Sequence, residues 1–597
     1  MEEEERTSNS PKWFRFQVFA RRIFNRIPIT ESQKIFLLTL MIGVVCGLAA
    51  VCFHLLLDFL QDHIIYRVAT IARWWVPLLI FIPAIGGVIS GAGLYFYAPR
   101  ARGSGIPQVK TAYYLEGGRI PARVIWSKMV LSAFNIGTGA SLGREGPTVQ
   151  ICAAIASLLG RMFAISRKRL QSLIPVGAAA GLAAAFNTPI AAVTFTLEEI
   201  LGQAASRPLG SIVIAAVIAA VIERAILGEH ALFNVPVYRL NSATELIFYA
   251  ALGLLAGLAA ITFNKSLLRL RASFKTQRLV PQWATPGVGG LILGGVGVLA
   301  LYLTGSSSTF GVGYGQLGIA LQTSLPLKIL LVLGAAKLIG TVVSYSSGSS
   351  GGIFGPSLYI GGMLGGAVGL AAKYLLGNPA VQPGAFALVG MGAVFAGIVR
   401  APVTSIIIIF EMTNNYSIIL PLMIANITSY MFATELSPTP IYDALLLQDG
   451  IHLPHEQRHA LKQVFVGAAM TTSVKTVKGS ETVRDVFQRL EGIPDHFHSY
   501  PVVAADRQLV GICTFNDLKR ALSAGKADHT IRDIGRKQLE TVTPNQTLDA
   551  ALVKMGRRSV SQLPVVAQDD DEELVGILTM QDIARKLASI ATTREAG

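Results

Sequence analysis

Long apolar runs occupy most of the chain from residue 35 onward, and few charges interrupt them. A helix needs about 20 mostly apolar residues to cross a bilayer, so these runs predict a polytopic α-helical membrane protein. The expected helices cover residues 35–57, 75–96, 124–136, 148–163, 173–185, 190–201, 209–226, 246–263, 288–303, 327–343, 357–376, 386–398, 405–410 and 418–432.

Many of these runs are too short to cross a bilayer, and glycine and proline rather than polar loops separate them. Short, interrupted apolar segments are typical of transporters whose broken helices meet inside the membrane. Irregular backbone survives at that depth only where it lines a cavity or is buried in protein. The pattern therefore predicts broken or half-length helices around a solute site.

An internal repeat relates two halves of this region, expected at residues 35–230 and 240–443. The motif G-x-x-G-P occurs at 143–147 and again at 352–356. Each copy is followed by a glycine, a proline twelve residues later and a glutamate nine residues after that: Gly177, Pro189 and Glu198, then Gly390, Pro402 and Glu411. Paired halves are usual in secondary transporters. We expect structural roles for the two glutamates, and the motifs leave open whether the halves are inverted.

The pattern changes after about residue 444, where charges become frequent and apolar runs short. Two similar units follow, each with a helix, two strands joined by a turn, and a helix that begins near an aspartate. We expect an α/β tandem repeat. The predicted segments are an N-terminal segment (1–34), a membrane domain (35–443), a linker (444–463), two tail units (464–526 and 527–590) and a terminal tail (591–597).

Composition and charge agree with a membrane protein. Charged residues make up 15% of the chain, against about 25% in soluble proteins, and the mean hydropathy is +0.51. The net charge of +15 comes from Lys and Arg that gather before residue 35 and at the ends of apolar runs, as in cytoplasmic loops. We therefore expect a lipid bilayer as partner, no nucleic acid, and both termini in the cytoplasm.

Three further classes of feature are not expected. The basic N-terminal segment and the long first apolar run argue against a cleavable signal peptide. The four cysteines, Cys46, Cys52, Cys152 and Cys513, have no metal-ligand or redox spacing, so we expect packing roles and no metal site. No nucleophile–base set is apparent in the sequence, so we do not expect an enzyme.

The segment Gly103-Ser-Gly-Ile-Pro107 has the composition of an anion-binding loop. Its glycines let the backbone turn with N–H groups exposed, and Ser104 adds a hydroxyl donor. A loop of this kind at a helix N-terminus attracts anions through unpaired N–H groups and the helix dipole. The alternative for this motif alone is a tight turn with a capping serine.

The segment Gly143-Arg-Glu-Gly-Pro147 places a carboxylate, Glu145, in a second glycine-bounded helix start. An ionised carboxylate can occupy the position of a bound chloride, and protonation would release it. Glu145 is therefore a candidate gate and proton carrier in one side chain. The alternative is a first-turn glutamate that stabilises the helix dipole by about 0.3–1 kcal/mol. Carboxylates inside a membrane are functional-site candidates by default.

The segment Gly352-Ile-Phe-Gly-Pro356 offers the backbone amides of Ile353 and Phe354 without any charge. A dehydrated halide needs donors, but a fixed cation would hold it too tightly for turnover. A flexible glycine-rich connection is the alternative, because serines and glycines fill the preceding residues 346–351.

Together these three motifs, in this order and spacing, resemble the CLC chloride channel and transporter family, and the resemblance extends from about residue 35 to the end. It implies a homodimer with one anion pathway per subunit and halves of inverted topology. By the same resemblance, Glu145 is the gating glutamate, and the anion-binding residues are Ser104, Gly105, Ile106, Glu145, Ile353, Phe354 and Tyr442. Without the resemblance, Tyr442 would pass as an interfacial aromatic residue.

Glu199 bears on the choice between channel and exchanger. In the family it matches the inner proton-transfer glutamate, where channel members usually lack an acid, so it favours proton-coupled exchange through Glu145 and Glu199. The alternative is that Glu199 pairs with a nearby Arg. Proline in place of Ser104 goes with nitrate preference in the family, and fluoride exporters have a different motif set, so Ser104 favours chloride.

The tail resembles a pair of CBS domains, which bind adenine nucleotides in the cleft between the two units. Asp517 and Asp582 match the position that holds a ribose hydroxyl, and Thr514 and Thr579 match the phosphate-side hydroxyl. The ligand expected from the resemblance is ATP, ADP or AMP. The alternative is a pair that binds nothing and forms dimer contacts, and an acidic turn at 569–573 would repel phosphates unless it points to solvent.

The resulting expectation is voltage- or pH-dependent Cl⁻/H⁺ antiport, regulated through the CBS pair, in a bacterial inner membrane. Chloride is the substrate, and no cofactor is required. The compact loops and short linker are typical of prokaryotic proteins. The alternatives are a passive chloride channel of the same fold, a transporter of nitrate or fluoride, a nucleotide sensor with a membrane anchor, and a metal-ion transporter with a similar tail.

Overall fold

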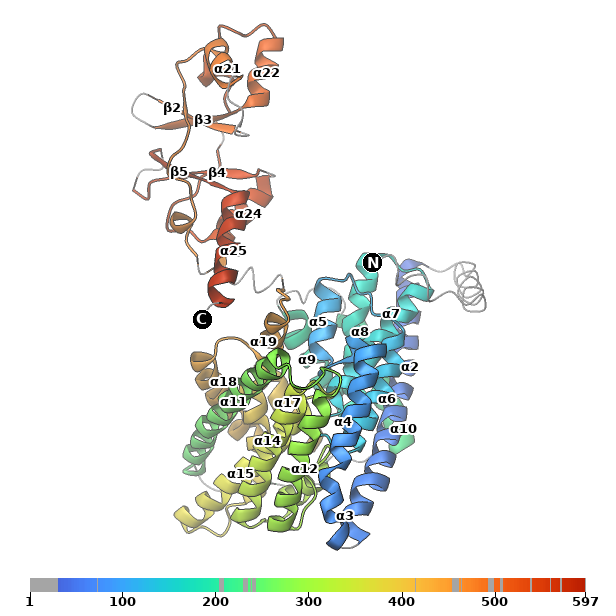
Figure 1. The fold of residues 1–597 in the computed structure, drawn as a ribbon. Coiled ribbons are helices and arrows are strands. Elements are labelled where there is room, and N and C mark those ends of the chain that lie inside the picture. The colour runs from blue at the N-terminus through green and yellow to red at the C-terminus, as the bar shows by residue number, and fades with distance from the viewer. Residues whose placement is uncertain are drawn as a thin grey trace. The chain divides into compact units, whose positions relative to one another are not determined.

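The computed structural model describes residues 30–595 apart from 72, 203–208, 229–232, 234, 237, 239–242, 414, 454–460, 463, 492–498, 505–507, 537–538, 559 and 570–571. Contacts divide the chain into two compact units, Met1–Ile451 and His452–Gly597 (Figure 1). Most of the expected N-terminal segment, part of the expected linker, part of the acidic turn and the last two residues lie outside the described residues.

The first unit consists of helices joined by loops, without a β-strand in its described part. Its helices are α2 (Glu31–Gln61), α3 (Arg67–Ile71), α4 (Ile82–Ala92), α5 (Ile106–Tyr114), α6 (Arg123–Gly137), α7 (Glu145–Met162), α8 (Arg167–Phe186), α9 (Pro189–Phe195), α10 (Leu209–Leu227), α11 (Glu245–Thr276), α12 (Thr285–Thr304), α13 (Tyr314–Gln322), α14 (Leu327–Ser346), α15 (Phe354–Leu376), α16 (Pro383–Val399), α17 (Pro402–Thr413), α18 (Ile419–Leu436) and α19 (Ile441–Gln448). All the expected apolar helices are present. The short helices α3, α5, α13 and α19 were not among the expected spans.

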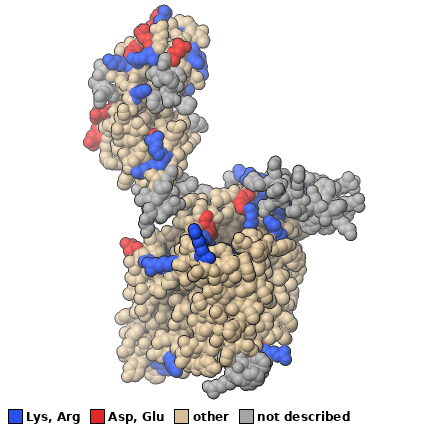
Figure 2. Space-filling view, in the orientation of Figure 1, with Lys and Arg blue, Asp and Glu red and all other residues tan. Residues whose placement is uncertain are grey.

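The surface of this unit is that of an integral membrane protein. Within the described residues, nine helical segments are long and apolar enough to cross a membrane. Large apolar side chains such as Leu255, Leu299 and Met431 are exposed on it. Figure 2 shows Lys and Arg near the two ends of the unit and a broad band almost without charge between them. Water would penalise such a band, whereas lipid tails accept it.

Glycine lets the helices of the first unit pack with their backbones in contact. A Cβ atom at Gly361 of α15 would lie 2.2 Å from the carbonyl oxygen of Gly390 in α16. The same occurs between α7 and α8, where a Cβ at Gly177 would lie 2.4 Å from the Cys152 carbonyl oxygen. Small residues at helix interfaces let membrane helices pack closely, because lipid provides no hydrophobic driving force between them.

Three of the four cysteines are packed in the interior as expected. Cys46, Cys152 and Cys513 are buried, whereas Cys52 is exposed on α2.

The elements of the two halves match in order. A G-x-G turn precedes a nine-residue helix in each half: residues 103–105 before α5 and residues 311–313 before α13. The G-x-x-G-P helices α7 and α15 follow, and then α8 and α16. Both of the latter end on a left-handed residue, Asn187 at φ 58° and Arg400 at φ 71°. The next short helix, α9 or α17, begins at a proline two residues later.

Two repeat-related glutamates bind the halves together reciprocally. The Glu411 carboxylate accepts from the amides of Ile190 (3.0 Å) and Ala191 (2.8 Å) at the start of α9. The Glu198 carboxylate, in the π-helical segment η5 (Thr196–Leu201), accepts from the amides of Val403 (3.3 Å) and Thr404 (2.9 Å) at the start of α17. Each half thus supplies the anion that pairs the free amides of the other half's broken helix. The structural role expected for both residues is confirmed.

The second unit contains two copies of one α/β motif. Its elements are β1 (Val477–Lys478), α21 (Val483–Glu491), β2 (Ser499–Val503), β3 (Leu509–Thr514), α22 (Phe515–Ser523), α23 (Ile531–Ile534), α24 (Leu548–Arg558), β4 (Gln562–Val566), β5 (Leu574–Thr579) and α25 (Met580–Glu595). The antiparallel pairs correspond: Tyr500 opposes Cys513 in one copy, and Leu563 opposes Leu578 in the other. Burial raises the pKa of the Cys513 thiol to about 12, so it remains protonated as a packing residue. The expected helices and strands of both tail units are confirmed.

The reciprocal caps generate a first prediction. Glu411→Ala leaves the two α9 amides without their acceptor, and a hydrogen bond to a charged group is worth about 1.5–3 kcal/mol. We expect the apparent melting temperature of the purified protein to fall by several degrees, measured by tryptophan fluorescence in detergent. Glu435→Ala, at an exposed position on α18, is the control. Equal melting temperatures for the two variants would contradict the capping role.

Candidate functional site

Three glycine loops far apart in the sequence form one hydrogen-bonded junction. The amides and carbonyls of Gly143 and Gly352 pair in both directions at 2.7 Å. The Gly351 amide donates to the Gly103 carbonyl at 3.2 Å. The starts of α5, α7 and α15 are therefore fixed against one another by their own backbone, as buried polar groups require.

Gly105 shows why these loops need glycine. Its φ of +107° lies in the region that disfavours side chains, and a Cβ atom there would lie 2.5 Å from the Gly146 carbonyl oxygen. The backbones of the first and second motifs are in direct contact at this point. Any larger residue would separate the two helix starts.

Four buried donors near this junction lack a well-formed hydrogen bond to an acceptor elsewhere among the described residues. The hydroxyls of Ser104 and Tyr442 are buried and lie close to each other, and neither reaches a further protein group. The amides of Ile353 and Phe354, before and at the start of α15, make no backbone hydrogen bond as donors within the described part of the chain. Leaving a buried polar group unpaired costs about 1–3 kcal/mol, so a cluster of such groups indicates a bound partner that accepts hydrogen bonds.

Tyr442 lies near several of the predicted site residues. It is the second residue of α19, is fully buried, and lies within electrostatic range of Ser104, Glu145, Glu199 and Tyr345. The site therefore collects residues from the starts of α5, α7 and α19 and from η5.

Two predicted donors are engaged elsewhere. The Gly105 amide donates to the Gln108 side chain at 2.9 Å, which caps α5. The Ser104 amide donates to the Tyr345 hydroxyl at 3.4 Å. Ile106 is the first residue of α5 and is fully buried. This loop therefore offers the Ser104 side chain, whereas the Gly105 amide serves the helix cap.

Glu145 is held by the second half of the repeat. It is the first residue of α7 and is fully buried. One carboxylate oxygen accepts from the Gly355 amide at 3.2 Å, at the start of α15, and the other accepts from the Tyr314 hydroxyl. The carboxylate thus occupies an anion position at a helix N-terminus.

Two buried lysines were missed by the sequence reasoning. Lys128 and Lys337 are fully buried and stand seventeen residues before Glu145 and Phe354, respectively. Lys128 donates to the Gly103 carbonyl (2.6 Å) and Lys337 to the Gly311 carbonyl (2.6 Å). The equal spacing to the two motifs is the signal that could have found them. Both place a buried amino group behind a G-x-G loop, without an ion-pair contact among the described residues.

Glu199 belongs to a buried ionic cluster. Its carboxylate pairs with the Lys110 ammonium at 2.8 Å, and the same ammonium pairs with Asp443 at 2.5 Å. The three side chains are 4–9% exposed. The sequence alternative named an arginine as the partner of Glu199, and the contact that the structure describes is with a lysine, Lys110 of α5. Asp443 follows Tyr442, so the cluster links the candidate proton site to the candidate anion site.

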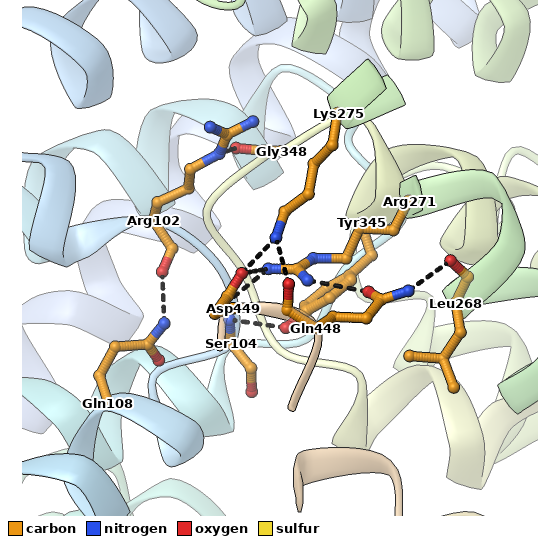
Figure 3. Close-up of polar contacts among 10 residues, drawn as sticks. All are labelled: Arg102, Ser104, Gln108, Leu268, Arg271, Lys275, Tyr345, Gly348, Gln448 and Asp449. Atoms are coloured by element: carbon orange, nitrogen blue, oxygen red, sulfur yellow. Dashed lines mark hydrogen bonds and ion pairs between the residues drawn. The ribbon is translucent and has the colours of Figure 1, made fainter. Parts of the chain in front are cut away.

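A basic cavity of about 190 Å³ lies beside Ser104. It is lined by Arg102, Arg271 and Lys275 together with Tyr345, whose hydroxyl contacts the Ser104 amide. Figure 3 shows Arg271 and Lys275 converging on Asp449, while Arg102 reaches the Gly348 carbonyl. Three cations and one carboxylate leave this cavity net positive, which favours anions.

The same contacts anchor the end of α19. Arg271 of α11 donates to both Asp449 oxygens at 2.9 Å and to the Gln448 side chain at 2.9 Å. Gln448 in turn donates to the Leu268 carbonyl at 2.8 Å (Figure 3). Because α19 is short and begins next to Tyr442, fixing its end also fixes that tyrosine.

The second unit has a cavity of about 370 Å³ between its two copies. Its lining includes Thr514, Arg536, Glu540, Arg558 and Ser561. The volume is in the range of small-molecule sites. Of the four residues predicted to hold a nucleotide, only Thr514 lines it.

The other three predicted nucleotide residues have structural contacts. Asp517 accepts from the Thr514 amide (3.1 Å), and Asp582 accepts from the Thr579 amide (3.0 Å), so each aspartate caps its own helix. Asp582 is 5% exposed and also accepts from Thr471 at 3.3 Å. The described residues contain no group of three or more metal-ligating side chains.

Comparison with known proteins places the fold. The sequence profile of the family described as voltage gated chloride channel matches residues 86–434, more than half of the chain. The chain belongs to this family, the CLC family. CBS domain profiles match residues 466–524 and 531–589. The expected fold class, a polytopic helical CLC unit with broken helices followed by a CBS pair, is thereby confirmed.

Individual CLC proteins cover the membrane unit. The H⁺/Cl⁻ exchange transporter ClcA of Vibrio campbellii is 34% identical over 429 residues, which are 70% of this chain and 89% of that relative. The crystal structure of a slow cyanobacterial Cl⁻/H⁺ antiporter aligns with a TM-score of 0.63 at 28% identity, covering 69% of this chain and 97% of that one. A eukaryotic CLC transporter aligns over 92% of this chain and 98% of that one with a TM-score of 0.61, at 20% identity.

The buried cluster around Lys110 generates a second prediction for this CLC protein. Lys110→Met removes the ammonium that pairs with both Glu199 and Asp443, and breaking a buried ion pair costs about 3–5 kcal/mol. We expect a lower melting temperature in detergent at pH 7.5, with partial recovery at pH 5, where the carboxylates can bind protons. The matched control is Lys110→Arg, which keeps the charge. Recovery that is absent at low pH would contradict the assignment of the cluster as ionic.

Proposed function

We propose that this chain is a Cl⁻/H⁺ antiporter. The observation that carries the proposal is the position of Glu145, whose carboxylate accepts from the Gly355 amide at the start of α15. A removable anion lies where a halide would lie, next to buried hydroxyls that reach no further protein group among the described residues. A passive channel has no need for a second acid such as Glu199, whereas an exchanger does.

Uncharged donors suit the transported anion. The hydroxyls of Ser104 and Tyr442 and the amides of Ile353 and Phe354 can replace part of a halide's hydration shell. Conduction requires binding that is strong enough for access and weak enough for release. The buried lysines Lys128 and Lys337 donate to backbone carbonyls of the two turns, so they hold the loops and leave the anion to the uncharged donors.

Glu145 couples protons to this anion because both compete for one position. In its ionised form, the carboxylate fills the amide site and excludes a halide. Protonation removes its charge, weakens its hold on the amide, and lets the side chain leave so that an anion can enter. Differential affinity of one site for two occupants is sufficient for coupling.

Glu199 is the proposed proton carrier on the other side of the anion site. It is 7% exposed and lies within electrostatic range of Tyr442. Its ion pair with Lys110 provides a buried carboxylate with a partner in the interior of the membrane unit. The names of the Vibrio relative and of the cyanobacterial structure, both proton-coupled exchangers, support this assignment over a passive channel.

Chloride is the proposed anion. The Ser104 hydroxyl is buried beside the Tyr442 hydroxyl and reaches no further protein group among the described residues, which suits a large, weakly hydrated halide. Nitrate or fluoride transport remains the second candidate, and anion competition in the flux measurement below separates the three. No cofactor is proposed for the membrane unit.

The proposed setting is a homodimer in a bacterial inner membrane with cytoplasmic termini. Arg102, Arg271 and Lys275 lie around Asp449, the residue that follows α19, and basic residues favour the cytoplasmic side. Apolar side chains on α9, α17 and α18, including Ile190, Val403 and Leu420, are exposed and available to a second copy.

The CBS pair is the proposed site for an adenine nucleotide, which would regulate transport. The cavity lined by Thr514, Arg536 and Arg558 supports the proposal, since guanidinium groups are good partners for phosphate. Glu540 pairs with Arg558 at 3.1 Å and would have to be displaced by a phosphate there. A CBS pair that has only a structural role is the alternative.

The antiport proposal is tested by two variants. Glu145→Gln should abolish proton movement and leave chloride flux, because the amide cannot ionise. Glu199→Gln should also stop proton movement while chloride flux continues. Chloride and pH electrodes on proteoliposomes measure both fluxes, with Glu435→Gln as the control. Wild-type protein that moves chloride without any proton flux would make it a passive channel.

The nucleotide proposal has its own test. Calorimetry on the whole purified protein should detect ATP or AMP binding, and Arg536→Gln and Arg558→Gln should each weaken it about tenfold, as expected for loss of a charge-assisted hydrogen bond. Arg484→Gln, at an exposed position paired with Asp528, is the control and should retain wild-type affinity. Failure of the wild-type protein to bind either nucleotide would favour the structural role.

A further inference from the structure

Tyr314 contacts the candidate gate directly. Its hydroxyl donates to one Glu145 carboxylate oxygen, while the Gly355 amide donates to the other. Gly355 leaves space for both groups, because a Cβ atom there would lie 2.7 Å from the Tyr314 hydroxyl and 3.1 Å from the carboxylate oxygens. The three residues come from α13, α7 and α15, so the contact exists only in the folded protein.

The position of Tyr314 in the repeat is informative. It is the first residue of α13, directly after the turn 311–313, as Ile106 is the first residue of α5 after the turn 103–105. The first turn presents the Ser104 hydroxyl to the candidate anion site. The matching turn of the second half presents the Tyr314 hydroxyl to Glu145. Both halves thus place one neutral hydroxyl on the same pathway.

Tyr314 is held firmly in this position. The Phe233 ring packs edge-on at a centroid distance of 5.7 Å, and the Arg144 guanidinium lies 5.7 Å from the ring centroid. The turn before it is anchored, since Gly311 donates to the Gly139 carbonyl (3.1 Å) and accepts from Lys337 (2.6 Å). A hydroxyl fixed in this way costs little further ordering when it binds a carboxylate.

The other charged and titratable groups around Glu145 are few. Lys337 of α14 and Tyr442 of α19 are within electrostatic range of Glu145, and Arg144, the residue before α7, lies above the Tyr314 ring. Among the charged and titratable side chains of the described residues, only that of Tyr314 makes a hydrogen bond to the Glu145 carboxylate. A phenol that donates to an ionised carboxylate forms a stronger bond than one to the neutral acid. Tyr314 therefore favours the ionised, seated form of Glu145.

We propose that Tyr314 is the latch of the gate: its hydroxyl holds the ionised Glu145 side chain in the amide site and thereby sets the pH at which the gate opens and how often it opens. This inference rests on the proposed gating role of Glu145. Tyr314 acts through that carboxylate and is a positioning residue. Removal of the hydroxyl oxygen alone, as in Tyr314→Phe, keeps the packing of the ring and therefore tests the hydrogen bond by itself.

The test is Tyr314→Phe in proteoliposomes, with chloride and proton fluxes followed from pH 4.5 to 8. We expect turnover at pH 7.5 to rise about five- to tenfold, because one charge-assisted hydrogen bond of the closed state is lost. We expect the half-maximal pH of transport to move upward by about half a unit to one unit, since the ionised form of the gate is no longer favoured. The chloride-to-proton ratio should stay the same, because Glu145 and Glu199 are intact. Tyr302→Phe, at an exposed tyrosine of α12, is the matched control.

A double variant separates the latch from the gate. In Glu145→Gln protein the latch has no ionised partner, so adding Tyr314→Phe should change chloride flux less than about twofold, and that flux also reports that the double variant is folded. A wild-type turnover and pH profile for Tyr314→Phe would overturn the latch. An equal flux change in both backgrounds would overturn it too, because the hydroxyl would then act on the anion itself. Retained proton coupling in Glu145→Gln alone would instead overturn the gating role.

Discussion

Buried hydrogen-bond donors that find no acceptor elsewhere in the described part of the chain are the feature on which the rest of this structure depends. Where helices are broken inside a membrane, their first amides must be paired by protein or by a ligand. Backbone bonds between Gly143, Gly352, Gly351 and Gly103 satisfy part of this demand. What remains unpaired, mainly at Ser104, Tyr442 and the start of α15, is the candidate anion site, and glycine is needed because only backbones in contact bring these donors together.

The two halves of the repeat pair the free amides of their broken helices in the same way, and they differ at the candidate gate. Glu198 and Glu411 cap each other's half, and Lys128 and Lys337 hold equivalent turns. The divergence is at the third position of the G-x-x-G-P motif, which is Glu145 in the first half and Phe354 in the second. A carboxylate from the first half can therefore fill the amide site of the second half. If both halves carried a glutamate at this position, two negative charges would meet in the same site.

In the tail, too, the residues singled out by resemblance differ from those that line the cavity. The aspartates singled out by resemblance, Asp517 and Asp582, each cap the helix on which they stand. The cavity between the copies takes its charged lining from Arg536, Glu540 and Arg558, which lie outside the matching motif. A short motif thus records the fold of each CBS domain more reliably than it records the residues that face a ligand.

The sequence by itself determined the membrane character, the two halves, the three glycine motifs and the α/β tail, because apolar runs, motif spacing and turn residues reflect preferences of neighbouring residues. It did not predict α13 or α19, which are short and carry no long apolar run. Tertiary structure alone decided that Tyr314 meets Glu145, that Lys110 joins Glu199 to Asp443, and that the Gly105 amide serves a cap. These are contacts between side chains or amides whose partners are set by packing, and local pattern carries no record of a partner that lies on another helix.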